Sequence, residues 1–538
     1  MPMRARKEGF MKHIKKVITL LISAVMVLAM SSAVFAANPE PNEFTGGAFS
    51  QTPETTISAT GLTAGDKVEV YQLVKWDATA SDWALDGTCG VALDELINGI
   101  TEAEATTIAG TSGLHKVTDL TADENGEISY DCTDNPGLFY LKAIPAATNK
   151  DTVYNPAFVS ADYYAGGNTV NFSDTIGSST VVKKSTVPFD KEVTGADSFV
   201  DTKIGDVIPF KITTEIPSYG TSFVNPVFTI TDTLSAGLTL EGDITVKYGN
   251  ATTTETVSKV VTITKGTPDN GFTVAFDKEY LTGLQGETPE VEITYSAKVT
   301  TQALENVTYM DNKAKLEFSD TPTSTKDKED ITRHYTFSLD SNLNGGNHGD
   351  ERTRELIKIG VDDKGKTVTA FTSWQEGKSW TTETPLAGAK FQLVGTQGQG
   401  TYTAESDENG YISFKGLDAG TYTLTETEAP AGYIKDNSSH TVIITPTYTT
   451  GTDILESYTV SIDGNTSSYT ITNMSDTDAT VETTVDNSSM TFPFVNTKGS
   501  ELPSTGGIGT VIFYTIGSLL VIGCGIVLVS RRRMQKNK

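Results

Sequence analysis

The sequence has few of the residues on which most catalytic and metal sites are built. Its 538 residues include three cysteines and five histidines. Neither type occurs in the spacing of a zinc site or of a catalytic Cys–His pair. No Ser-His-Asp order and no pair of glycosidase-type carboxylates stands out either. These absences argue against an enzyme, and we expect neither a cofactor nor a metal.

Basic side chains are also scarce, with 41 lysines and arginines against 68 acidic residues and a net charge of −27. Residues 1–36 and 506–538 each carry a net charge of +5, so the chain between them carries −37. Such a charge disfavours binding to nucleic acid or to anionic membranes. The central part also retains only Cys89 and Cys132, which could pair outside a cell but make no disulfide framework.

The first of two long apolar runs lies near the N-terminus. Three lysines (Lys12, Lys15 and Lys16) precede the apolar run 17–30, and a small-residue segment ends at Ala36. This order is typical of a secretory signal peptide, and not of a transmembrane helix. We therefore expect residues 1–36 to be removed and the rest of the chain to be exported.

The second long apolar run, 508–530, lies near the C-terminus and is followed by three arginines. As a helix it is long enough to span a bilayer, with the arginines on the cytoplasmic side. The run follows a pentapeptide composed of Leu502, Pro503, Ser504, Thr505 and Gly506. Together, residues 502–538 resemble the cell-wall sorting signal of Gram-positive surface proteins. The resemblance implies that a sortase cuts after Thr505 and links its carboxyl group to an amine, with peptidoglycan as the final attachment. The alternative is a single-pass anchor that stays in the membrane.

Between these ends, short segments rich in Val, Ile, Thr and Tyr alternate with turns rich in Gly, Asp and Asn. This texture predicts an all-β chain of tandem immunoglobulin-like sandwiches, with one helical stretch at about 91–109. We place an N-terminal domain at 37–184, a middle domain at 185–320 and a C-terminal domain at 331–498. A polar segment, 320–330, is expected to connect the last two.

The most specific internal motif is the stretch from Tyr422 to Tyr433, TYTLTETEAPAGY with its preceding threonine. Alternation predicts that Glu426 points inward, where a lone carboxylate is costly unless it is protonated or paired. The stretch resembles the E-box of Gram-positive pilins and collagen-adhesin B-type domains. The resemblance implies an isopeptide bond in which Lys358 attacks the Asn496 amide with help from Glu426. The alternative is that Lys358 faces solvent and that Asn496 is a turn residue.

A second set of motifs resembles the pilin middle domain of collagen-adhesin A-type. It comprises the segments 188–193, 228–239, 291–297 and 312–318. The resemblance implies that Lys191 is the nucleophile, Asp232 the proton shuttle and Asn312 the acceptor amide, with Asn306 as the alternative acceptor. A turn-capping role is the alternative for Asp232. The first domain shows no comparable set, and we expect Lys75 to face solvent.

Two further features leave alternatives open. Lys183 and Lys184 lie where pilins place the lysine that a sortase joins to the next subunit. The usual Tyr-Pro-Lys form is absent here, and the alternative is a solvated pair of linker lysines. The segment from Asp340 to Glu351 fits the written pattern of a calcium loop, against an ordinary Gly/Asn-rich loop.

We interpret the chain as the major subunit of a covalently polymerised surface pilus that supports adhesion. The partners implied by the resemblance are a sortase, identical subunits and peptidoglycan, with a host surface ligand possible and no nucleic acid. The alternatives are a wall-anchored adhesin that does not polymerise and a minor pilus subunit.

Overall fold

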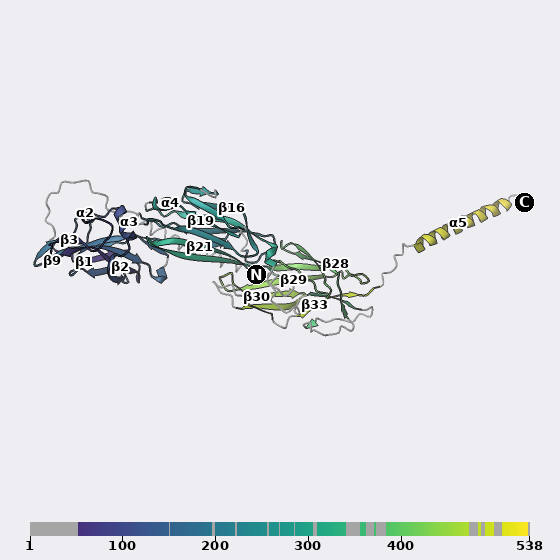
Figure 1. Cartoon of the computed structure of the whole chain (residues 1–538). Helices are drawn as coiled ribbons and strands as arrows, with labels where there is room; N and C mark the ends of the chain where they lie inside the picture. The colour runs from purple at the N-terminus through teal and green to yellow at the C-terminus, as the bar shows by residue number, and fades with distance from the viewer. Residues whose placement is uncertain are drawn as a thin grey trace.

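In the computed structural model, three strand-rich blocks follow one another along the chain, and a single helix extends beyond the third block (Figure 1). The structure describes residues 52–149, 151–195, 199–220, 223–254, 258–267, 270–284, 286–304, 309–339, 356–361, 371–372, 383–472, 482–485, 490–499 and 508–535. The predicted signal peptide, the pentapeptide 502–506, the alternative acceptor Asn306 and the Asp340–Glu351 segment lie outside these residues.

The first block contains two main sheets, ordered β3-β2-β6-β8 with β4 also on β2, and β11-β1-β5. Two small pairs, β10-β9 and β12-β7, complete it. The expected helical stretch forms two short helices, α2 and α3. The elements are β1 (Thr56–Thr60), β2 (Lys67–Asp77), β3 (Asp82–Leu85), α2 (Leu93–Asn98), α3 (Glu102–Gly110), β4 (His115–Thr121), β5 (Ile128–Asp131), β6 (Gly137–Ile144), β7 (Thr152–Tyr154), β8 (Ala157–Ala161), β9 (Tyr163–Ala165), β10 (Asn168–Val170), β11 (Ser179–Val181) and β12 (Lys184–Thr186).

The first block contains two separate apolar clusters. Cys132 is buried in one and Cys89 in the other, and both thiols are free. Lys75 is half exposed and lies 2.9 Å from Asp86, so it faces solvent as expected.

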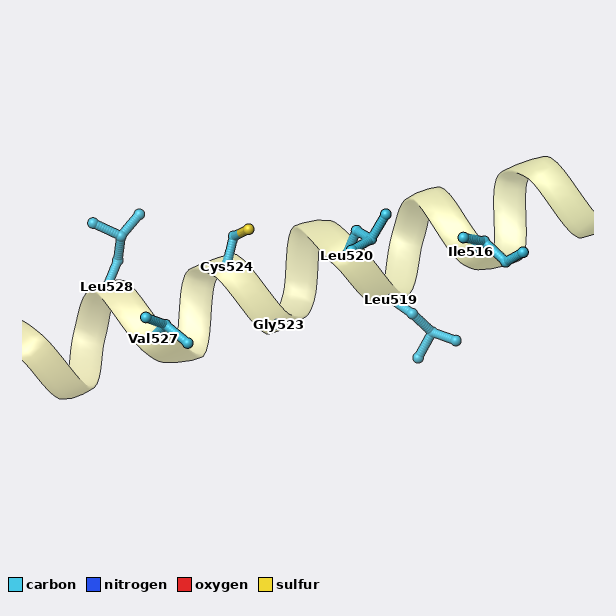
Figure 2. A pocket seen from close by; sticks show the side chains of 7 residues that line it. All are labelled: Ile516, Leu519, Leu520, Gly523, Cys524, Val527 and Leu528. Carbon is cyan, nitrogen blue, oxygen red and sulfur yellow. The ribbon is translucent and has the colours of Figure 1, made fainter.

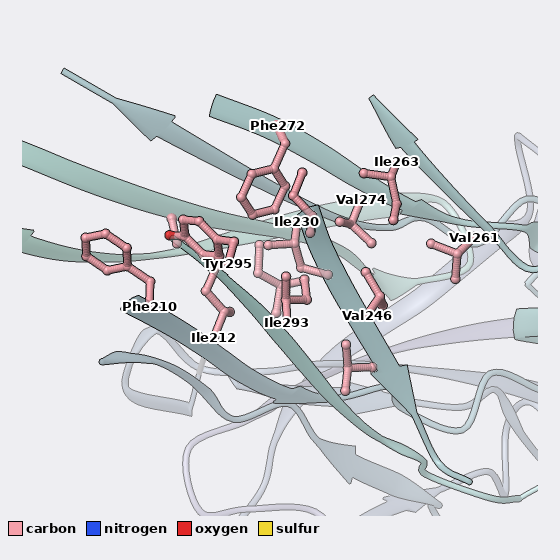
Figure 3. Packing of buried hydrophobic residues seen from close by; sticks show 14 of the residues in the cluster. Phe210, Ile212, Ile230, Val246, Val261, Ile263, Phe272, Val274, Ile293 and Tyr295 are labelled. Atoms are coloured by element: carbon pink, nitrogen blue, oxygen red, sulfur yellow. The ribbon is translucent and has the colours of Figure 1, made fainter. Parts of the chain in front are cut away.

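The middle block is a sandwich of two five-stranded sheets, β13-β14-β20-β16-β17 and β18-β19-β15-β21-β22. One apolar core lies between the sheets, and Figure 3 shows part of it. The elements are β13 (Phe189–Val193), β14 (Val207–Glu215), β15 (Phe228–Leu234), β16 (Leu238–Tyr248), β17 (Ala251–Thr253), β18 (Val261–Lys265), β19 (Gly271–Phe276), α4 (Lys278–Thr282), β20 (Glu290–Val299), β21 (Met310–Thr321) and β22 (Ser324–His334).

The polar segment 320–330 is not the connection that we expected from the sequence. Most of it forms β22, which pairs antiparallel with β21 from Ser324 to its last residue, His334. The misleading signal has a physical cause: β22 is an edge strand whose first half is largely exposed, so its sequence is polar although its backbone belongs to the sheet. The middle sheet therefore extends past residue 320.

The third block also has two sheets, ordered β24-β33-β23-β25 and β27-β26-β28-β29-β30-β31-β32. Its first and last strands, β23 and β33, lie side by side in parallel. The elements are β23 (Leu356–Val361), β24 (Phe371–Thr372), β25 (Glu383–Pro385), β26 (Lys390–Gly395), β27 (Thr401–Glu405), β28 (Gly420–Glu428), β29 (Ser439–Tyr448), β30 (Leu455–Ile462), β31 (Asn465–Thr472), β32 (Glu482–Val485) and β33 (Met490–Thr497).

Helix α5 (Ile508–Gln535) contains the predicted membrane span and is long and apolar enough to cross a bilayer. Figure 2 shows the apolar side chains that project from successive turns of this helix: Ile516, Leu519, Leu520, Val527 and Leu528. Two arginines lie in its last turn. An apolar helix followed by arginines is the arrangement that a stop-transfer segment requires.

A partly buried ion pair joins the middle block to the third. Arg333 Nη1 on β22 lies 3.0 Å from Asp453 Oδ1, and the Arg333 backbone N–H donates to Oδ2 of the same carboxylate. Tyr335 donates its hydroxyl proton to the Asp453 carbonyl at 3.0 Å and accepts from Leu455 N–H at 3.2 Å. One aspartate therefore organises several contacts across this junction.

We predict that Asp453→Ala opens the junction, because the substitution removes the carboxylate that both pairs with the Arg333 guanidinium and accepts from the Arg333 backbone N–H. Trypsin should then cut after Arg333 at least several-fold faster, as measured by mass spectrometry of timed digests. Asp327→Ala is the matched control, because Asp327 forms only an exposed pair with Lys315 at 3.5 Å. Equal rates of cleavage after Arg333 in both variants would show that Asp453 does not hold the junction.

Candidate functional sites in the two sandwich cores

The middle core contains a lysine whose ammonium group is buried against a carboxylate. Lys191 on β13 and Asp232 on β15 come from opposite sheets, and Lys191 Nζ donates to Asp232 Oδ2. The two side chains have no solvent-exposed area. The alternation that buries Phe228, Ile230 and Leu234 also turns Asp232 inward, so it is not a turn-capping residue.

The electrostatics of this pair favour loss of both charges. Burial lowers the pKa of Lys191 to about 8, although the nearby carboxylate opposes the shift. Burial likewise raises the pKa of Asp232. Both shifts favour transfer of a proton from the ammonium to the carboxylate, which would leave a neutral, nucleophilic amine.

Asn312 on β21 is fully buried and reaches the pair through a residue that the sequence did not single out. Its Nδ2 donates to the Tyr295 hydroxyl at 2.9 Å, and that hydroxyl donates to Asp232 Oδ2 at 2.7 Å. The inward alternation of β20 could have indicated Tyr295, because a tyrosine at a core position needs a partner for its hydroxyl.

The third block contains a similar set on three strands. Lys358 on β23 and Asn496 on β33 are fully buried, and Glu426 on β28 is 4% exposed. Lys358 Nζ lies 2.9 Å from Glu426 Oε1, within ion-pair distance although not in hydrogen-bonding direction. Asn496 Nδ2 lies 3.1 Å from both carboxylate oxygens. Lys358 is thus not a solvent-facing lysine and Asn496 is not a turn residue.

Burial also lowers the pKa of Lys358, against the attraction of Glu426. The carboxylate is fixed in place by the Asp436 backbone N–H, which donates to Oε2 at 2.7 Å. In the parallel ladder Lys358 is opposite Phe494 and Gly360 is opposite Asn496, so lysine and asparagine lie two residues apart on adjacent strands. Aromatic rings line both sites: Lys191 Nζ lies 5.3 Å from the Phe210 ring centre and Lys358 Nζ lies 5.5 Å from that of Phe391.

Each site therefore brings together a desolvated amine, a carboxyl group and a primary amide in a water-poor core. These are the groups needed to condense a lysine with an asparagine and release ammonia. The described residues contain no group of three or more His, Cys, Asp and Glu side chains placed to hold a metal ion.

Lys183 and Lys184 lie at the junction of the first and middle blocks. Lys184 opens β12, and its Nζ donates to Thr63 Oγ1 at 3.0 Å and to the Leu62 carbonyl at 3.3 Å. Lys183 is exposed, and its carbonyl accepts from Asn155 N–H at 3.0 Å.

Comparisons with known proteins agree with this architecture. Residues 376–457 match the prealbumin-like fold domain family, and residues 495–536 match the LPXTG cell wall anchor motif. The chain is 28% identical over 508 residues to the trypsin-resistant surface T6 protein of Streptococcus pyogenes serotype M6, covering 82% of this chain and 88% of that protein. The chain also matches the solved structure of the T6 backbone pilin of serotype M6 Streptococcus pyogenes, with a TM-score of 0.55 and 20% identity. The match covers 84% of this chain and 100% of the T6 pilin chain.

In sequence and fold, the chain resembles a Gram-positive pilus backbone subunit. This agrees with the all-β tandem fold predicted from the sequence, and the LPXTG match confirms the predicted cell-wall location. The matched anchor segment includes both the pentapeptide and helix α5, so the protein is exported and attached to the cell wall at its C-terminal end.

Proposed function

We propose that this pilin is a covalently closed rod segment, in which each of the last two domains is locked by one Lys–Asn isopeptide bond. The observation that carries the proposal is the burial of Lys191 and Lys358 against Asp232 and Glu426. An asparagine amide is hydrogen-bonded to each carboxylate, directly in the third block and through a tyrosine hydroxyl in the middle block. A buried charge pair alone adds little to stability. A pair placed beside an unpartnered amide carbonyl has a chemical use, and the Oδ1 atoms of both Asn312 and Asn496 have no hydrogen-bond partner.

The bonds would be placed where tension acts. Lys191 lies in the first strand of the middle block and Asn312 in its penultimate strand, while Lys358 and Asn496 lie in the first and last strands of the third. Tension entering at the lysine and leaving at the asparagine would pass through the new amide bond. The enclosed segments of 121 and 138 residues would then be shielded from stretching.

We further propose that a sortase cleaves after Thr505 and joins its carboxyl group to Lys183 or Lys184 of another copy, with peptidoglycan receiving the last subunit. The LPXTG match supports sortase processing at this end. The lysine pair lies at the junction of the first two blocks. The middle and third blocks lie between this junction and the anchor helix (Figure 1), and this separation supports head-to-tail linkage. The assembled fibre would support adhesion to a host surface.

We predict that the mature chain, residues 37–505, has lost the mass of two ammonia molecules, one for each bond. Lys191→Ala and Lys358→Ala should each restore one, because each removes one nucleophile. Intact-mass measurement decides this, and Lys75→Ala is the control with an exposed lysine that should leave both losses in place. The full uncondensed mass in the unmodified chain would refute both bonds.

We also predict that replacing Lys183 and Lys184 together by alanine abolishes the ladder of high-mass species in wall extracts on a denaturing gel. The monomer should remain attached to the wall, because Thr505 and the anchor are intact. The single variants show which lysine is used. A ladder that persists in the double variant would place the linking lysine elsewhere in the chain.

A further inference from the structure

The middle and third sites differ in how the carboxyl group reaches the amide. In the third site the glutamate contacts the asparagine Nδ2 directly, at 3.1 Å to each oxygen. In the middle site the carboxyl belongs to an aspartate, which is one methylene shorter. There the amide Nδ2 contacts the Tyr295 hydroxyl instead, and that hydroxyl contacts the carboxylate. The tyrosine thus occupies the gap that the shorter acid leaves.

The hydrogen-bond directions at Tyr295 follow from its chemistry. The phenol has one proton, which it donates to Asp232 Oδ2, so its oxygen accepts from the Asn312 amide. Its ring is held in place on two sides: Phe210, its cross-strand neighbour, stacks at a centroid distance of 5.3 Å, and Phe272 packs edge-on at 4.7 Å (Figure 3). The hydroxyl is therefore fixed between the acid and the nitrogen that must leave.

Ammonia is a poor leaving group unless the departing nitrogen receives a proton. In the third site Glu426 can deliver it directly to Asn496. In the middle site the hydroxyl group in contact with Asn312 Nδ2 is that of Tyr295, which accepts a hydrogen bond from this nitrogen before the reaction. Burial and the adjacent carboxylate raise the pKa of Tyr295 well above its ordinary value, so the phenol keeps its proton before the reaction and can pass it on only when Asp232 supplies another.

We propose that Tyr295 is a catalytic proton relay for closure of the Lys191–Asn312 bond, a role that rests on the bond proposed above. Lys191 first gives one ammonium proton to Asp232, and its lone pair forms the Nζ–Cγ bond with Asn312. The Cγ–Nδ2 bond breaks as Nδ2 takes the Tyr295 proton, and Asp232 reprotonates Tyr295. Asp232 then takes the surplus proton from Nζ. The products are an amide, one ammonia and a protonated Asp232, so atoms and charge balance.

The test compares closure kinetics of Tyr295→Phe and the unmodified mature chain. The protein is made in a cell-free reaction, quenched in acid at timed intervals and digested, and the linked and unlinked Lys191 and Asn312 peptides are quantified by mass spectrometry. Tyr295→Phe keeps the ring and its packing but removes the relayed proton. We expect the Lys191–Asn312 bond to form at least tenfold more slowly, while the Lys358–Asn496 bond in the same molecule forms at its unchanged rate.

Tyr219→Phe is the matched control, because Tyr219 is buried in the same core and its hydroxyl donates to the Val227 carbonyl away from the site. It should close at the unmodified rate. A fluorinated tyrosine at position 295 separates the hydroxyl group from the packing of the ring. It has the hydroxyl proton that Tyr295→Phe lacks, so it should restore closure of the Lys191–Asn312 bond.

The outcomes separate the two proposals. Absence of the linked peptide in the unmodified chain refutes the bond itself. A linked peptide that forms equally fast in Tyr295→Phe and the unmodified chain overturns the relay alone. Equal slowing in Tyr219→Phe, or a fluorinated tyrosine as slow as phenylalanine, would assign the effect to packing and also overturn the relay.

Discussion

The structure of the last two domains depends on one constraint: a lysine ammonium is held beside a carboxylate where water cannot solvate either charge. An unreacted pair of this kind has a desolvation cost comparable to its mutual attraction, so it is a weak source of stability. The same desolvation lowers the pKa of Lys191 and of Lys358 and so favours their neutral, reactive form. Condensation with an asparagine would replace both charges by a neutral amide and a protonated acid, which an apolar core accommodates far better.

Each site joins the first strand of its domain to the last or penultimate strand, so the proposed bonds would affect how the domain responds to pulling. By analogy with disulfides, closing loops of 121 and 138 residues would remove roughly 4–5 kcal/mol of unfolded-state entropy each, in a model-dependent way. The mechanical consequence is larger, because a covalent bond from the first strand of a domain to its last or penultimate strand would carry tension that would otherwise shear the sheet. The mature chain has few cysteines for this purpose, and its two described thiols lie in separate clusters.

Much of the fold was predictable from period-two alternation, which correctly turned Tyr422, Leu424 and Glu426 to the same buried face. The separation of Lys358, Glu426 and Asn496 by up to 138 residues could be bridged only through motif resemblance, since alternation says nothing about which strands become neighbours. Two features of the structure were not predictable from the sequence in this way. The sequence predicts a connection where the edge strand β22 lies, because the exposed face of this strand is polar. Tyr295 was missed because a core tyrosine is common, and its partners come from strands β15 and β21, one on each side of it in sequence and both in the opposite sheet.

Single-molecule pulling of the mature chain from its two ends tests the central claim most directly. With both bonds closed, segments 191–312 and 358–496 should contribute no stepwise lengthening. In Glu426→Ala, which lacks the carboxyl needed for the third domain's bond, a new step on the order of 450 Å should appear, since each residue released adds roughly 3.3–3.6 Å. Equal total extension of the unmodified chain and Glu426→Ala would contradict the account.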